Sequence, residues 1–200
     1  MSAYPAAAEQ SRYPVQYEAD YVERRSRLTT FFRWLLAIPH LIVISVLGFF
    51  AYIVVIVAWF ALLFTARWPQ GMYNFTAGVL RYAARLYGYL HLATDTYPPF
   101  DLGEHDEYPI RLKIAPPLES YSRAKVFFRI LLAIPVAIIA YALYLVANLG
   151  AFIAWFVIVI TGKQAQGLQN MINLGVAYYV RSAAYFCLIT EDWPPFGADD

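Results

Sequence analysis

Hydrophobic and polar positions divide the chain into two similar halves, and each half begins with a short alternating segment. In the first segment, at residues 15–20, the apolar residues Val15, Tyr17 and Ala19 alternate with polar ones, and the second segment is IRLKI at 110–114. Alternation with a period of two predicts one half-exposed strand in each half. The polar positions are mainly acidic in the first segment and basic in the second, so we expect the two strands to pair.

A long apolar run follows each alternating segment, at residues 31–66 and 127–162. As one straight helix, each run would extend about 54 Å, whereas the hydrocarbon core of a bilayer is about 30 Å thick. Proline suits the first turn of a helix and disrupts its interior. We therefore expect Pro39 and Pro135 to divide the two runs.

Each run is interpreted as a short helix at the membrane interface followed by a membrane-crossing helix. In the first half the short helix covers residues 27–38 and the crossing helix 39–64, and in the second half the crossing helix covers 135–160. Trp59 and Trp155 fall near the far ends of the crossing helices, where indole rings favour the interface. A tight hairpin with two crossings inside each run is an open alternative.

A further helix is predicted in each half, at residues 70–93 and 166–189. Small and polar residues recur there at helical spacing, and such a stripe lets helices pack closely. Each segment is long enough to span a bilayer, although its Arg and Tyr content also suits a helix lying flat in the interface. The stripe residues are Asn74, Gly78, Arg81, Arg85 and Gly88 in the first half, and Gln166, Asn170, Ala177, Arg181 and Ala184 in the second.

The two halves are copies of one another. A shift of 96 residues aligns residues 26–100 with 122–196 without a gap, and 28 of the 75 aligned pairs are identical, which indicates a tandem duplication. The copies close with TDTYPPF and TEDWPPF, and because proline cannot continue a helix, these phrases predict the end of the second helix. The expected organisation is a flexible tail (1–12), a first membrane repeat (13–100), a linker (101–107), a second membrane repeat (108–196) and a C-terminal tail (197–200).

The composition is that of a membrane protein. Hydrophobic residues make up 60% and charged residues 14% of the chain, against about 45–50% and about 25% in soluble domains. A net charge of +1 gives no indication of nucleic-acid binding. Cys187 is the single cysteine, which excludes an intrachain disulfide framework. The polar first thirty residues do not resemble a cleaved signal peptide.

The positions of the charges predict a membrane topology. If each copy crosses twice and both copies run in the same direction, ten Lys and Arg lie on one side, with Arg67 and Lys163 on the other. The positive-inside rule then places the N-terminus, the linker and the C-terminus in the cytoplasm. The alternative has one crossing per copy with the second helices flat on opposite surfaces, which would separate the two strands.

Few residues are candidates for chemistry. The three histidines share no metal-ligand spacing, no catalytic motif is present, and we expect no catalytic residues, metal site or cofactor. Ionisable groups inside membrane helices are candidate functional residues, so Arg81, Arg85 and Arg181 are the candidates for binding an anion or a lipid headgroup. The predicted interfacial anchors are Arg33, Arg129, Trp59, Trp155, Tyr97 and Trp193.

The phrases YPV, SRLTTFFRWLLAIPHLIV, AWFALLFTARWPQG and TDTYPPF, in this order, resemble a bacterial membrane-protein family known as domain of unknown function 4389. The resemblance covers nearly the whole chain, with one unit in each half. It implies an integral membrane protein and supplies no reaction or cofactor. The second unit departs from the pattern, because His40 has no counterpart there and TGKQAQG lacks the proline of TARWPQG.

These observations predict an all-α membrane protein of two helical hairpins, with four transmembrane helices, short interfacial helices and a small strand pair on the cytoplasmic side. We expect a non-enzymatic scaffold, membrane-shaping protein or accessory subunit in the bacterial cytoplasmic membrane. Its expected partners are the lipid bilayer, anionic lipid, and further copies or a larger assembly, with no nucleic acid. The alternative is a small oligomeric channel or transporter for an anion or lipid that uses the candidate arginines; a lipid-modifying enzyme is less favoured.

Overall fold

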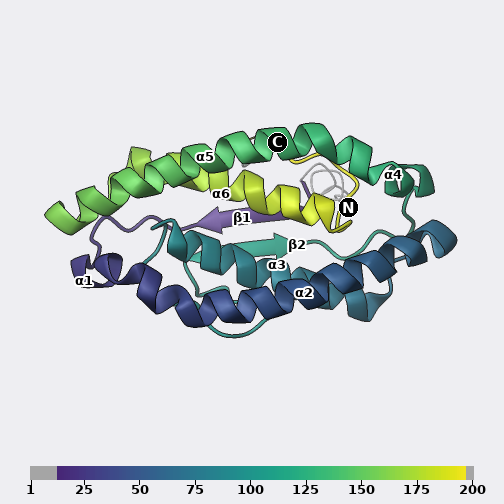
Figure 1. Ribbon diagram of the computed structural model, residues 1–200, viewed down its shortest axis with the longest axis horizontal. Helices are drawn as coiled ribbons and strands as arrows, with labels where there is room; N and C mark the ends of the chain where they lie inside the picture. The colour runs from purple at the N-terminus through teal and green to yellow at the C-terminus, as the bar shows by residue number, and fades with distance from the viewer. Residues whose placement is uncertain (1–12, 197–200) are drawn as a thin grey trace, which may run out of the picture.

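The computed structural model describes residues 13–196, and the predicted tails at 1–12 and 197–200 lie outside the described residues. Between residues 13 and 196 the chain forms six helices and two strands (Figure 1). In chain order these are β1 (Val15–Ala19), α1 (Arg27–Phe31), α2 (Arg33–Thr65), α3 (Gln70–Leu90), β2 (Ile110–Ile114), α4 (Arg123–Phe127), α5 (Arg129–Thr161) and α6 (Gln166–Phe186).

The two strands pair as the charge pattern predicted. They are antiparallel, and Glu18 stands opposite Arg111 in the register. Glu18 accepts hydrogen bonds from Arg111 Nε at 3.1 Å and from Lys113 Nζ at 2.9 Å, and Asp20 lies 2.7 Å from Arg111 Nη2. The predicted strand pair is therefore confirmed, and its outer face carries a network of ion pairs.

The inner face of the sheet packs on α3 and α6. Val15 on β1 and Ile110 on β2 are fully buried; β2 contacts α3, and β1 contacts α6. A side chain at Gly88 on α3 would place its Cβ 2.9 Å from the Ile110 side chain. The small residue at this position of the predicted stripe thus permits close approach, but the neighbour is a strand rather than a helix.

The elements form three layers. α3 and α6 contact each other in the middle layer, the sheet covers one side of them, and α2 and α5 pack on them as the outer helices. In Figure 1, α2 and α5 follow the lower and upper edges of the molecule along its long axis. Within the described chain, α2 and α5 are the two helices long and apolar enough to cross a membrane. The prediction of four crossing helices therefore finds support for two. The other two, α3 and α6, are less apolar and have 12 and 10 of their 21 residues buried inside the protein.

The break in each apolar run precedes the proline. The backbone turns at Phe32 (φ −90°, ψ 9°) and at Phe128 (φ −86°, ψ 10°), and the long helices then continue through Pro39 and Pro135. The predicted breaks at these prolines are therefore wrong. Each proline falls in the second turn of a helix of 33 residues, so one missing backbone donor is offset by the rest of the hydrogen-bond ladder. The short helices are five residues long, with a serine as N-cap.

The two copies run in opposite directions and hold each other at both ends. The backbone N–H of Arg25 donates to Gly162 O at 2.9 Å, and the equivalent N–H of Tyr121 donates to Ala66 O at 2.8 Å. The start of each long helix therefore lies beside the end of the other. Lys163 accordingly pairs with a residue at the start of the first copy, Glu23, at 2.9 Å. The expectation that both copies run in the same direction is therefore wrong. The predicted division of charges, which placed Lys163 on the opposite side from the N-terminal arginines, is wrong for the same reason.

The double-proline phrases do not end the helices. In each copy a leucine with left-handed backbone, Leu92 (φ 65°) or Leu188 (φ 62°), reverses the chain first. The following N–H closes the turn, as when Ala93 donates to Gly88 O at 2.9 Å; this is the Schellman arrangement. The predicted second helices are thus three residues too long, and the phrases are free to fold back over the long helices.

Candidate functional site

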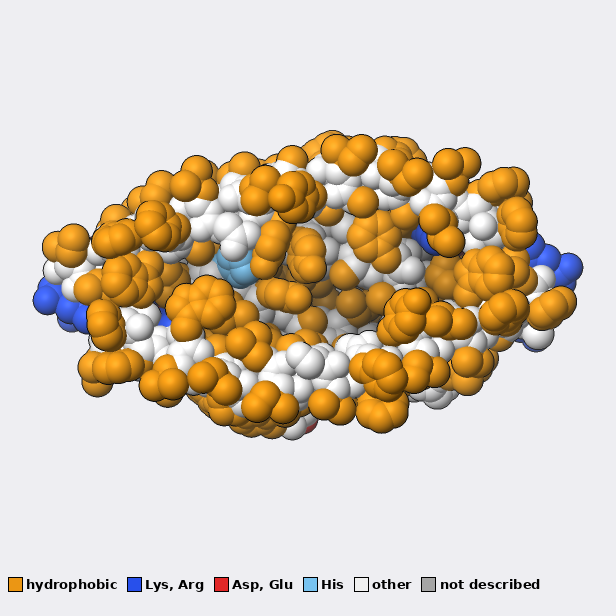
Figure 2. Space-filling model, viewed as in Figure 1, with side chains coloured by type: hydrophobic (Ala, Val, Ile, Leu, Met, Phe, Trp, Pro, Cys, Tyr) orange, Lys and Arg blue, Asp and Glu red, His pale blue; other side chains and the backbone are white. Residues whose placement is uncertain are grey.

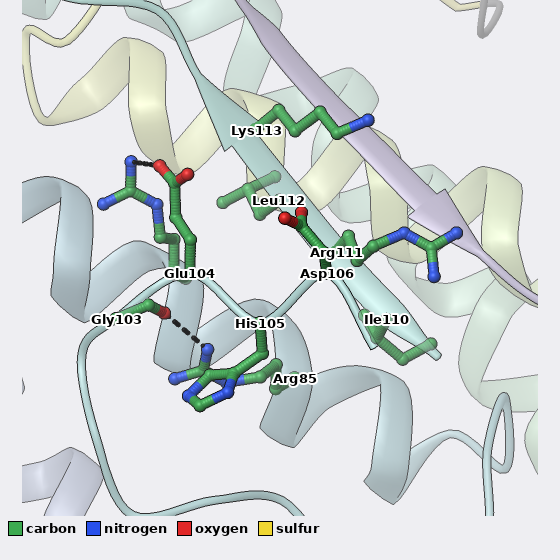
Figure 3. Close-up of a pocket in the computed structure, with 10 residues that line it drawn as sticks. Arg85, Gly103, Glu104, His105, Asp106, Ile110, Arg111, Leu112 and Lys113 are labelled. Carbon is green, nitrogen blue, oxygen red and sulfur yellow. Dashed lines mark hydrogen bonds and ion pairs between the residues drawn. The ribbon is translucent and has the colours of Figure 1, made fainter. Parts of the chain in front are cut away.

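The first predicted anion-binding residues, Arg81 and Arg85, lie on α3 and hold the linker between the two copies. Arg85 is buried and donates from Nη1 to the carbonyl oxygen of Gly103 at 2.8 Å and from Nη2 to that of Asp101 (Figure 3). Arg81 forms an ion pair with the exposed Glu104. The linker therefore supplies the acceptors that an anionic ligand would otherwise provide.

The space around these two arginines is small. Figure 3 shows the linker residues on one side and β2 on the other, with Arg111 and Lys113 projecting from the strand. The remaining cavity is about 20 Å³, which is room for roughly one water molecule. As arranged here, Arg81 and Arg85 fix the linker against α3.

Arg181 occupies on α6 the place that Arg85 has on α3, and it lines a different cavity. It is buried, and Nη1 lies 3.4 Å from the carbonyl oxygen of Pro195 in the closing phrase of the second copy. The cavity beside it, between α6 and β1, has a volume of about 300 Å³. The three candidate arginines therefore do not form one site.

Arg33, predicted to reach lipid headgroups, is an internal residue. It is 1% exposed, and its guanidinium donates to the carbonyl oxygens of Tyr89 and Thr94 and to the carboxylate of Asp95. Asp95 also accepts the N–H of Ser26 at 2.7 Å. The prediction of an interfacial anchor is wrong here, because the closing phrase TDTYPPF supplies buried acceptors that the sequence pattern did not reveal.

Arg129, the equivalent residue of the second copy, is also internal and not an interfacial anchor. It is 4% exposed, and its guanidinium carbon lies 4.0 Å from the centre of the Tyr185 ring. Among the described residues none forms a hydrogen bond with its guanidinium nitrogens. The two copies thus place the same arginine in the same position with different partners.

The predicted aromatic anchors divide into two kinds. Trp59 donates from Nε1 to Val126 O at 3.0 Å, and Trp155 donates to Thr30 O at 3.2 Å, so each holds the short helix of the other copy. Tyr97 and Trp193, in the closing phrases, are 43% and 52% exposed. The latter two remain available as interfacial anchors, whereas the former two join the copies.

His40 is fully buried, and its surroundings did not follow from the hydrophobic pattern. Its ring stacks on Phe100 with centroids 3.9 Å apart, and Nδ1 lies 2.6 Å from the Tyr82 hydroxyl. In the second copy, where valine replaces this histidine, the equivalent aromatic rings Tyr178 and Phe196 stack directly with centroids 5.3 Å apart. The missing counterpart of His40 was the available signal, and it marks a difference in packing.

The largest of these three cavities is a hollow of about 650 Å³ between α2 and α5. Its walls are mainly aromatic and aliphatic, from α2, the end of α3 and the second half of α5, and they include Trp34, Ala151 and Phe152. Figure 2 shows a hollowed region between the two long helices on a face otherwise covered by hydrophobic side chains. This apolar cavity lies well within the size range of ligand sites, about 300–1,000 Å³, and has a predominantly apolar lining, whereas the cavity beside Arg181 stands at the lower end of that range. No element of the sequence pattern predicted the apolar cavity, because its walls come from both copies.

No group of three or more His, Cys, Asp or Glu side chains within residues 13–196 is placed to hold a metal ion. A family model described as "Domain of unknown function (DUF4389)" matches the chain twice, at residues 27–101 and 123–198. The chain belongs to this family. Two DUF4389 units in tandem therefore form most of the molecule, each running from a short helix to a double-proline phrase, while both strands lie outside the matched segments. Neither curated proteins nor solved structures gave a match.

Proposed function

We propose that this DUF4389 protein is a non-enzymatic, membrane-shaping component that lies in the plane of the bilayer. In this arrangement α2 and α5 are sunk into one leaflet, and the charged outer face of the sheet is in water. The observation that carries the proposal is the separation of an apolar face from a charged face along the same length of the molecule.

The apolar face is formed by the two outer helices. Between Arg33 and Thr65, and between Arg129 and Thr161, neither helix contains any further charged residue. Their large hydrophobic side chains are widely exposed, as at Phe49. On the face in Figure 2, Lys and Arg show mainly at the two ends. An exposed apolar surface of this extent is typical of membrane contact.

The charged face argues against a crossing orientation for the isolated chain. The strands run along the long axis between the two ends of the molecule (Figure 1). If α2 and α5 stood upright in a bilayer, the ion pairs of Glu18, Asp20, Arg111 and Lys113 would lie at membrane depth, where charged groups are costly. A helix of 33 residues is also about 50 Å long, against about 30 Å of hydrocarbon. Lying flat avoids both costs.

An in-plane position explains how the molecule would shape a membrane. Two long apolar helices in one leaflet displace lipid from that leaflet alone, as amphipathic helices do. We place the charged face on the cytoplasmic side of a bacterial cytoplasmic membrane, in keeping with the positive-inside preference.

Labelling of single cysteines from one side of a vesicle tests the orientation. The variants are Arg67→Cys, Lys163→Cys and Asp106→Cys, each in a Cys187→Ala background, because these three residues are exposed. An in-plane chain reacts with an impermeant maleimide at all three positions from the same side. Upright antiparallel helices would expose positions 67 and 163 on opposite sides. The four-crossing topology would instead separate position 106 from the other two. Either of the last two patterns contradicts the proposal.

Remodelling of liposomes tests the activity. The purified chain is expected to convert spherical vesicles into tubules or smaller vesicles, visible by electron microscopy. The double variant Phe49→Glu with Leu149→Glu places charges on the apolar face and should abolish both membrane binding and remodelling. Lys113→Gln, on the charged face, is the matched control and should act as the wild type does. Binding without any change in vesicle shape would leave a membrane protein but rule out the shaping activity.

A channel or transporter is the second candidate, and one observation bears on it. Copies standing upright could turn their charged faces towards one another and so line a polar path. Such a chain would show opposite labelling of positions 67 and 163, together with an anion flux that Arg81→Ala abolishes. The pairing of Arg81 with Glu104 makes that path less favourable for an anion.

A further inference from the structure

The apolar cavity between α2 and α5 has one polar corner, where α3 ends. His91 lines this corner and is 5% exposed. Its Nδ1 lies 2.8 Å from the carbonyl oxygen of Tyr87. Since a carbonyl oxygen only accepts, Nδ1 carries the proton and donates it. Burial lowers the pKa of the His91 imidazole, so the ring is neutral and Nε2 is an acceptor.

The second nitrogen of His91 accepts no hydrogen bond from the described residues, although a polar side chain, that of Asn148, lies nearby. Among the described residues, none forms a hydrogen bond with Nε2, which is buried. Asn148 lines the same corner and lies close enough to the His91 ring to oppose the effect of burial on its pKa, but its Nδ2 donates to the carbonyl oxygen of Tyr144 at 2.8 Å. A buried acceptor without a donor is costly. A ligand that brings a donor into this corner would remove that cost.

The charges around the cavity select against an ionic ligand. Arg33 is the one charged residue in its described lining, and the guanidinium of Arg33 is already engaged by two carbonyl oxygens and by Asp95. A charged headgroup would therefore find no unpaired countercharge. The remaining surface is aromatic or aliphatic and suits a hydrocarbon chain.

We propose that this cavity binds one molecule of an uncharged, single-chain lipid with a hydroxyl group. The chain lies between α2 and α5, and the hydroxyl donates a hydrogen bond to Nε2 of His91. Because Nε2 is covered, the hydroxyl enters by displacing the Tyr144 ring, which meets the His91 ring edge-to-face with centroids 5.3 Å apart. The inference rests on the proposed membrane placement only for the source of the ligand, since the cavity opens on the apolar face.

The test compares two probes that differ in one donor. The full chain in detergent is mixed with octadecanol or with octadecyl methyl ether, and bound molecules are counted by native mass spectrometry. We expect one molecule per chain and a preference of about two- to tenfold for the alcohol, the effect of one net hydrogen bond. Equal binding of both probes by the wild type, or no stoichiometric binding of either, would overturn the proposal.

Three variants locate the site. His91→Phe keeps the ring contacts and should bind both probes equally, while Cys187→Ala, at the equivalent position of the second copy, should keep the preference for the alcohol. Ala151→Phe fills the cavity and should lose both probes. Each variant is first shown to unfold at a temperature close to that of the wild type.

Two results with folded variants contradict the assignment. One is a preference for the alcohol that survives in His91→Phe, and the other is wild-type binding by Ala151→Phe. Should His91→Phe fail to fold, His91→Leu replaces it in the same comparison. The assay contains no bilayer, so a chain that crosses the membrane instead of lying flat would still bind the alcohol. Failure of this proposal and failure of the in-plane placement are therefore seen separately.

Discussion

The two copies share a backbone path but differ in how their equivalent arginines are satisfied. Arg33 and Arg129 each begin a long helix, and each lies over a tyrosine ring, at 4.4 Å and 4.0 Å from the ring centre. Arg33 donates to Asp95 and to two carbonyl oxygens, whereas Arg129 has no hydrogen-bond partner among the described residues. In the second copy the residue equivalent to Asp95 is Glu191, which accepts the N–H of Ser122 and pairs with a lysine instead.

The copies also differ in how closely their helices approach. α5 and α6 pack closely because Gly150 and Gly175 face the opposite helix, and a Cβ at Gly175 would meet the Leu143 carbonyl and lie 2.7 Å from the Ala147 Cβ. The first copy has valines at both equivalent positions, residues 54 and 79. The lesson is that a duplicated backbone keeps its path through conserved turns and caps, while the contacts between its helices diverge.

The largest expected effect comes from removing the two arginines in turn. Arg33→Met leaves Asp95 and two carbonyl oxygens without their donor and should lower the free energy of unfolding by about 3–5 kcal/mol. Arg129→Met loses the contact with the Tyr185 ring and a charge attraction to Glu191, and it also removes a buried charge that has no hydrogen bonds among the described residues. We expect it to stay within about 1 kcal/mol of the wild type. Chemical denaturation in detergent measures both, and equal losses would show that the two sites are energetically alike.

The close approach of α5 and α6 gives the next effect. Gly175→Ala should lower the free energy of unfolding by about 1–3 kcal/mol, because the new methyl group overlaps backbone that cannot move freely. Gly167→Ala is the control on the same helix, since a Cβ there has nothing within 4 Å, and it should be neutral or slightly stabilising. Thermal unfolding compares the two. A neutral Gly175→Ala would mean that the helices separate easily.

A smaller effect is expected at the ends of the long helices, which have left-handed backbone in both copies. The residue is Ala66 (φ 58°) in the first copy and Gly162 (φ 73°) in the second. Ala66→Gly should raise the free energy of unfolding by up to about 1 kcal/mol, and Gly162→Ala should lower it by at least as much. Unfolding temperatures that move in the same direction in both variants would contradict this explanation.

The smallest effect concerns the ion pairs between the strands. Hydrogen bonds from Lys113 and Arg111 lower the pKa of Glu18, and Arg111 lowers that of Asp20. A depressed folded-state pKa stabilises the protein above the ordinary values of 4.5 and 3.8, and this contribution is lost as the pH falls through the folded-state values.

The double variant Glu18→Gln with Asp20→Asn should therefore be less stable than the wild type at neutral pH, by about 0.2–1 kcal/mol per pair. The difference should vanish in acid. A pH series of unfolding temperatures measures it, and a difference that persists in acid would assign the effect to packing.

Periodicity and charge predicted those parts of the fold that depend on local pattern. The strands, the pairing of an acidic with a basic strand and the duplication itself followed from the sequence. A short helix at the start of each apolar run was also expected, but the first was predicted at residues 27–38 and covers Arg27–Phe31. The break at Phe32 did not follow from the sequence, because a proline in the second turn looked like a stronger signal than a turn between two phenylalanines. The opposite directions of the copies could not follow either, since the cross-copy hydrogen bonds join residues far apart in the chain.

The candidate sites were harder to predict for the same reason. The sequence marks Arg81 and Arg85 as candidate binding residues and Arg33 as an interfacial anchor, but their partners come from the closing phrase and the linker, whose paths no periodicity describes. The cavity that contains His91 is bounded by both copies and became visible only with their mutual orientation.

Each copy donates a hydrogen bond from a tryptophan to the short helix of the other copy, and this has a consequence for biosynthesis. The indole that holds the first short helix belongs to a residue 125 positions further along the chain. When a ribosome has finished the first unit, the tryptophan that will hold its short helix has not yet been translated. Until the second unit emerges, the first short helix lacks this hydrogen bond unless another chain supplies it. A protein with one such unit would obtain the same hydrogen bonds by pairing with a second copy of itself.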